Sequence, residues 1–85
     1  VASAIGERLA RLAGTAQVLV VTHSPQVAAR SARHLLIAKS HDGTVTRTGV
    51  TPLDAAERRE EIARMLSGAE ITDEARAQAE RLIAA

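Results

Sequence analysis

A histidine stands where a buried strand is expected to end and a helix to begin. The run Val18–Val21 is continuously apolar, which is typical of a parallel strand covered on both faces. His23 follows after one threonine, and Ser24 and Pro25 supply a helix N-cap and a first helical residue. Ligands of open α/β sheets bind beyond the carboxyl ends of the strands, and helix N-termini favour anions. A neutral imidazole placed here can donate one hydrogen bond to a phosphate oxygen.

The spacing alone leaves two interpretations of His23 open: the imidazole senses a bound phosphate, or it only stabilises the turn. Ser24 beside it is expected to cap the helix rather than act as a nucleophile, because no G-x-S-x-G motif surrounds it. A metal site built from His23, His34 and His41 is not expected. Their spacing matches no standard zinc pattern, and the chain has no cysteine.

The rest of the pattern predicts an α/β order of elements. Helices are expected over residues 2–13, from 24 to 32, from 51 to a stop at Gly68, and from a cap at Thr72 onward. Strands are expected over residues 17–22, 34–39 and 44–50, the last two joined as an antiparallel hairpin at Asp42-Gly43. Gly14 suits the end of the first helix, and Thr51 suits the cap of the third.

The last two helices carry clear apolar faces. The first presents Ile62, Ala63 and Leu66, while its charged residues 57–61 are expected to face solvent. The second repeats apolar residues at i, i+4, i+7 and i+8, namely Ala75, Ala79, Leu82 and Ile83. We expect both helices to pack against the sheet of their own domain rather than to form a dimer surface.

Composition limits the core and the partners. The chain has 85 residues, no aromatic residue and a net charge of +1, so it offers little area to bury and no dense basic run for nonspecific DNA binding. It has no apolar run near the length of a membrane span. Because it begins with Val1 and holds a strand that needs neighbours, the chain is expected to be a fragment of a larger cytoplasmic protein.

Three stretches carry a family resemblance. VLVVTHSPQVAARSARHLLIAK resembles the histidine-switch region of ABC-type ATPases. SHDGTVTRTGVTPLD and RREEIARMLSGAEITDEARAQAERLIAA are similar to the hairpin and the terminal helices of the RecN family, which is one of the SMC-like (structural-maintenance-of-chromosomes-like) ATPases. The resemblance covers essentially all of the chain. It identifies residues 1–85 as the C-terminal part of an ABC-type P-loop ATPase head, in the order helix, parallel strand, helix, strand hairpin and two C-terminal helices. Within it, residues 17–39 form the strand, histidine switch, helix and strand, and residues 51–85 the helical pair.

The resemblance implies a function in DNA double-strand-break repair and recombination. His23 would be the catalytic switch histidine that contacts the γ-phosphate of ATP and helps to arrange the attacking water. Two heads of a homodimer would enclose ATP and Mg²⁺, which residues outside this chain mainly hold. DNA would be bound through the intact protein, in the cytoplasm at the bacterial nucleoid, with the remainder of the head as a further partner.

The chain lacks the phosphate-binding motif G-x-x-x-x-G-K-[ST], so it is expected to be inactive alone. Two other interpretations stay open. The chain can be a head fragment of another ABC-type ATPase, such as a transporter subunit or a chromosome-maintenance protein. It can also be a noncatalytic α/β interaction module that folds by itself.

Overall fold

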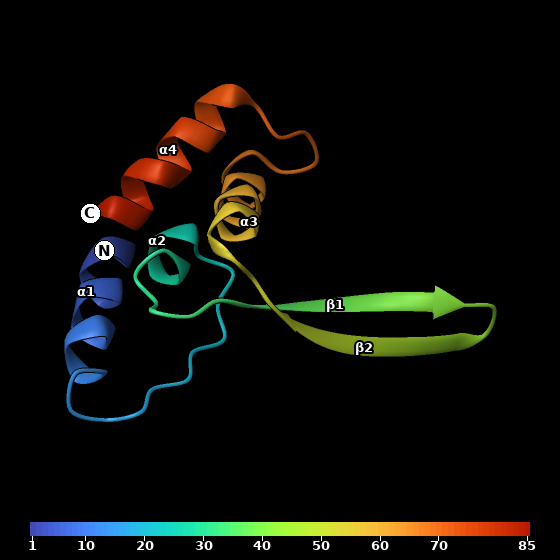
Figure 1. Cartoon of the computed structure of the whole chain (residues 1–85), viewed down its shortest axis with the longest axis horizontal. Helices are drawn as coiled ribbons and strands as arrows, with labels where there is room; N and C mark the ends of the chain where they lie inside the picture. Colours follow the sequence, from blue (N-terminus) through green and yellow to red (C-terminus); the bar gives the residue numbers. More distant parts are fainter.

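Four helices and one β-hairpin make up the chain (Figure 1). The computed structural model describes residues 1–85. In chain order the elements are α1 (Ala2–Leu12), α2 (Pro25–Ala28), β1 (Leu35–Asp42), β2 (Val45–Pro52), α3 (Ala55–Ser67) and α4 (Asp73–Ala84). The α/β class expected from the sequence is confirmed, because the chain combines helices with a two-stranded antiparallel hairpin. None of the helices has the length and apolar character needed to cross a membrane.

The hairpin extends away from the helices (Figure 1). The strands β1 and β2 pair antiparallel, with Leu35 opposite Pro52 at the base and Asp42 opposite Val45 at the tip. Gly43 begins the turn with φ of +65°, a backbone conformation that glycine adopts without steric cost. The predicted hairpin is therefore confirmed, with strands longer than the sequence pattern indicated.

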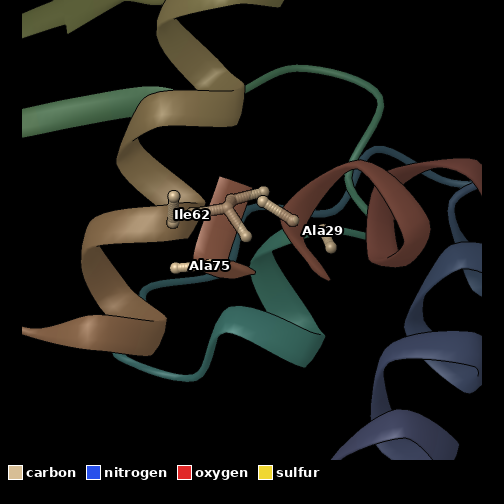
Figure 2. Close-up of a cluster of buried hydrophobic side chains, with 5 residues drawn as sticks. Ala29, Ile62 and Ala75 are labelled. Atoms are coloured by element: carbon tan, nitrogen blue, oxygen red, sulfur yellow. The ribbon is translucent and has the colours of Figure 1, made fainter. Parts of the chain in front are cut away.

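A small core lies where α4 packs on α3 and on the end of α2 (Figure 2). Its only fully buried large side chain is Ile62, at 0% exposure. The other core residues are alanines, and four further apolar side chains, Leu66, Ile71, Leu82 and Ile83, pack against them. The apolar faces predicted for the two terminal helices are confirmed, but the two helices pack on each other, and the hairpin projects beside them.

Local capping fixes the ends of these two helices. Asp54 caps α3 through a capping box: its carboxylate accepts from the Glu57 N–H at 2.8 Å, and the Glu57 carboxylate accepts from the Asp54 N–H at 3.0 Å. The predicted cap at Thr51 is wrong because β2 continues through Pro52 before the helix starts. Gly68 ends α3 with φ of +82°, and Thr72 caps α4, both as predicted.

The strand predicted over residues 17–22 does not form in this chain. The segment lies outside every helix and strand, and the side chains of Leu19 and Val21 are each 83% exposed. A parallel strand needs a neighbouring strand and a covering layer on each face. The only sheet in the chain is the two-stranded hairpin, so this apolar run finds no partner.

The first two helices are shorter than predicted. Helix α2 ends at Ala28 rather than at residue 32, and the chain then turns through Ala29 and Arg30. Helix α1 ends at Leu12 and is capped by Ala13, so the predicted cap at Gly14 is wrong. A four-residue helix has too few internal hydrogen bonds to be stable by itself. Tertiary contacts must therefore hold α2.

The substitution Ile62→Ala is expected to lower the free energy of unfolding by about 2–4 kcal/mol, because it removes the largest fully buried side chain and leaves a cavity. Urea denaturation measures the change. The matched control is Ile37→Ala on the hairpin, where the side chain is 55% exposed and the expected loss is less than about 1 kcal/mol. Equal losses at the two positions would show that the core lies elsewhere.

Hydrogen exchange of the amides of Val18–Val21 is expected to be fast in this chain, since the segment belongs to no helix or strand ladder. Their protection should fall well below that of the Ile62 and Ala63 amides in α3. NMR-detected exchange on the 85-residue chain measures both sets. Strong protection of Val18–Val21 would mean that the segment pairs as a strand after all.

Candidate functional site

His23 lies in an exposed turn immediately before α2. The turn is built by local polar contacts on both sides of the histidine: the Ser24 N–H donates to Thr22 Oγ1 at 3.0 Å, and Ser24 Oγ accepts from the Val27 N–H at 3.4 Å. The predicted N-cap role of Ser24 is thereby confirmed, and Pro25 takes the first helical position. The imidazole of His23 makes no hydrogen bond or ion pair within the chain. Its N–H is therefore free to donate to a ligand.

Helix α2 is held from the side of α1 by a close backbone approach. Gly6 is buried at this contact, and a Cβ atom there would lie 2.9 Å from Arg30 Cγ and 3.1 Å from the carbonyl oxygen of Gln26. Contacts below 3.0 Å force neighbouring atoms to shift. The absence of a side chain at Gly6 therefore allows α1 and α2 to pack closely.

Helix α2 is held from the other side by Arg58 of α3. The Nη2 group of Arg58 donates to the carbonyl oxygens of Ala29 at 2.8 Å and of Ser31 at 2.6 Å, with a longer contact to Ala28 at 3.3 Å. Burial lowers the pKa of Arg58 from its ordinary value. The prediction that the whole run 57–61 faces solvent is wrong at this residue and at Glu61, whose side chain is 12% exposed.

His34 forms a partly buried junction between the hairpin and α3. Its carbonyl oxygen accepts from the Leu53 N–H at 3.0 Å, while its Nδ1 atom is buried with no hydrogen-bond partner. The pKa of His34 is lowered, first by burial and then by the positive charge of Arg58, and the charge of Glu61 opposes this in part. Protonation of the His34 ring is therefore less favourable in the folded chain than for a free histidine.

The three histidines lie in different surroundings. His23 is exposed before α2, His34 is half-buried at the base of the hairpin, and His41 lies near the hairpin tip, where its Nδ1 is 3.0 Å from Thr46 Oγ1. No group of three or more His, Cys, Asp or Glu side chains is arranged to hold a metal ion. Among the residues singled out from the sequence, His23 alone combines exposure with a free ring.

Sequence reasoning missed Arg58. Its position in the charged run 57–61 of an amphipathic helix predicted a solvent-facing side chain. Its partners are backbone carbonyls 27–30 residues earlier in the chain, and carbonyls carry no sequence signal. The only available hint was an arginine beside the expected apolar face, and that pattern is common.

Comparison with known proteins finds relatives that share one name. The chain is 58% identical over 79 residues to the DNA repair protein RecN of Streptomyces coelicolor, a match that covers 93% of the chain. It is 43% identical over 83 residues, or 98% of the chain, to the proteins of the same name from Rickettsia felis and from Bacillus subtilis. These matches cover 14–15% of each relative, so the chain spans a small part of their length. No protein-family model matches the chain.

The free energy of unfolding is expected to fall as the pH drops below about 6.5, and His34 should supply part of this dependence. Above that pH the ring is neutral in both folded and unfolded chains. Below it the unfolded chain binds the proton first, because the folded pKa is lowered. Replacing the ring by an uncharged side chain in His34→Gln should therefore reduce the loss of stability between about pH 7.5 and pH 5.5.

Urea denaturation at several pH values tests this, with His41→Gln at the exposed hairpin tip as the matched control. An unchanged pH dependence in His34→Gln would contradict the assignment.

Proposed function

The chain belongs to the RecN family, and from this premise we propose that it works as the C-terminal part of an ABC-type ATPase head in a DNA repair protein. The observation that carries the proposal is the 42–58% identity to RecN proteins over 85–98% of the chain. The chain matches only 14–15% of the length of these relatives, so the activity of the whole protein is itself proposed.

We assign His23 as the residue that contacts the γ-phosphate. Its exposed position, its free ring and the capped turn that carries it all suit this role. The residues that cradle the α- and β-phosphates and hold Mg²⁺ would come from elsewhere in the protein, because the chain contains no G-x-x-x-x-G-K-[ST] motif. The ATP supplies a terminal phosphoryl group for transfer to water. The imidazole N–H would donate to a γ-phosphate oxygen and help to orient the attacking water.

The exposed apolar run Val18–Val21 fits a place inside a larger sheet. Leu19 and Val21 point into solvent in this chain, at a cost that a neighbouring strand and a covering layer would remove. We propose that the run pairs as a parallel strand with the remainder of the head. His23 would then stand at the carboxyl end of that strand, where ligands of open α/β sheets bind.

In the whole protein, two such heads would close on ATP as a homodimer and reopen on hydrolysis. That cycle would be coupled to DNA in double-strand-break repair and recombination at the bacterial nucleoid. The relatives' shared name supports the repair function, and the chain itself would contribute the histidine rather than the DNA contact.

Replacing His23 by alanine in the full-length protein is expected to lower the ATP turnover number by about tenfold or more. The affinity for ATP should change by less than about threefold, because other residues hold the α- and β-phosphates and the magnesium ion. Steady-state hydrolysis and equilibrium nucleotide binding measure the two quantities.

The matched control is His41→Ala, which removes an exposed histidine at the hairpin tip and should leave turnover unchanged. An unaltered turnover in His23→Ala would remove His23 from catalysis. An equal loss in the two variants would show that the effect is not specific to the turn before α2.

A further inference from the structure

A guanidinium at the end of α2 holds the helix whose first turn carries His23. Helix α2 has four residues and lies between α1 and α3 (Figure 1). A helix this short depends on its neighbours for stability. Its contact with α1 at Gly6 is steric, whereas its contact with Arg58 of α3 is polar and directional.

The acceptors of Arg58 are carbonyls at the C-terminal end of α2 and in the turn after it. The last carbonyls of a helix have no partner inside the helix and carry a partial negative charge, so a cation there is favourable. The two hydrogens of Nη2 are shared among the carbonyl oxygens of Ala28, Ala29 and Ser31. A hydrogen bond with a charged donor in a partly buried place is stronger than a neutral one in water. The Ala28 carbonyl also accepts from the Ser31 N–H at 3.2 Å and from the Ser31 hydroxyl at 2.8 Å, so Arg58 matters most for the carbonyls of Ala29 and Ser31.

The end of α2 is linked directly to its beginning. The Ala28 N–H donates to the Ser24 carbonyl at 3.0 Å, and the Ala29 N–H donates to the Pro25 carbonyl at 2.9 Å. Fixing Ala28 and Ala29 at one end therefore fixes Ser24 and Pro25 at the other, one helical turn away. His23 precedes Ser24 in the same capped turn, so its backbone position depends on where α2 is held.

Arg58 lies on α3 between the capping box and the centre of the core. It lies one residue after Glu57 of the capping box and four before Ile62, the centre of the core. By contrast, the neighbouring Arg59 pairs with Glu80 at 2.9 Å on an exposed surface. Surface pairs of this kind contribute little to stability. Arg58 binds backbone carbonyls at the end of α2, whereas the adjacent Arg59 binds a carboxylate of α4. Arg59 is therefore a matched control.

We propose that Arg58 is a positioning residue that sets the place of His23 through α2, and so couples the terminal helices to the histidine switch. This inference rests on the proposed function of His23. Arg58 would not contact the nucleotide itself. It acts only by holding the helix that follows the histidine.

The first test measures local opening, and it does not depend on ATP. Hydrogen exchange detected by mass spectrometry is followed in peptides over residues 24–31 of the full-length protein. Exchange should be about tenfold faster in Arg58→Ala and within about twofold of wild type in Arg59→Ala. Unchanged exchange in Arg58→Ala would overturn the proposal whatever happens to ATP turnover. Should Arg58→Ala fail to fold, Arg58→Gln keeps an N–H donor and removes the charge, and an effect in the same direction is expected.

The second test asks whether Arg58 acts through His23. In Arg58→Ala the kcat for ATP hydrolysis should fall by about fivefold or more with KM within about twofold, since the phosphate cradle lies elsewhere. In a His23→Ala background the same substitution should have no further effect on kcat. An equal fold-loss in both backgrounds would overturn the link to His23. If His23→Ala alone leaves turnover unchanged, the proposed function fails together with this link, while the exchange measurement still reports whether Arg58 holds α2.

Discussion

The contact of α4 with α3 and the end of α2, centred on Ile62, organises this chain. Four of the five core residues are alanines, whose small side chains let helix backbones approach closely but bury little apolar area each. With no aromatic residue to add area, the core has one large side chain at its centre. The position of every other element depends on how it is tied to this small cluster.

Polar contacts also join the elements to one another, and these contacts differ in how strongly water competes with them. Arg76 pairs with Glu60 and with Asp73, and Arg59 pairs with Glu80, on surfaces where water competes for the same groups. Arg58 differs because its acceptors are helix-end carbonyls in a partly buried place. Losing the guanidinium would leave the carbonyls of Ala29 and Ser31 without a protein partner, whereas the Ala28 carbonyl would keep the N–H and hydroxyl of Ser31. Arg58 therefore adds a directional polar contact to the apolar packing of Ala29, and together they connect the core helices to the turn that carries His23.

The apolar residues outside the core have a pattern of their own. Leu19 and Val21 are exposed in the segment before His23, and Ile37 and Val50 are exposed as a cross-strand pair of the hairpin. Exposed apolar side chains of this size are unfavourable in water. In the proposed head, residues outside this chain would cover the run before His23.

Sequence by itself determined the features that depend on neighbouring residues. The Ser24 cap, the hairpin turn at Gly43, the stop at Gly68 and the cap at Thr72 were all predictable, because each is set within a few residues of backbone. The apolar faces around Ile62 and Ala79 followed from helical periodicity. The family resemblance, and with it the choice of His23, was also available from the sequence.

Tertiary structure decided what depends on distant partners. The apolar run Val18–Val21 has the composition of a strand, yet a strand forms only where another strand offers its backbone, and this chain offers none there. The clamp of Arg58 on Ala29 and Ser31 joins residues 27–29 positions apart, and the acceptors are backbone atoms that any residue would supply. Local patterns specify caps and faces because the interacting groups are adjacent in sequence, whereas contacts between segments exist only after packing brings their backbones together.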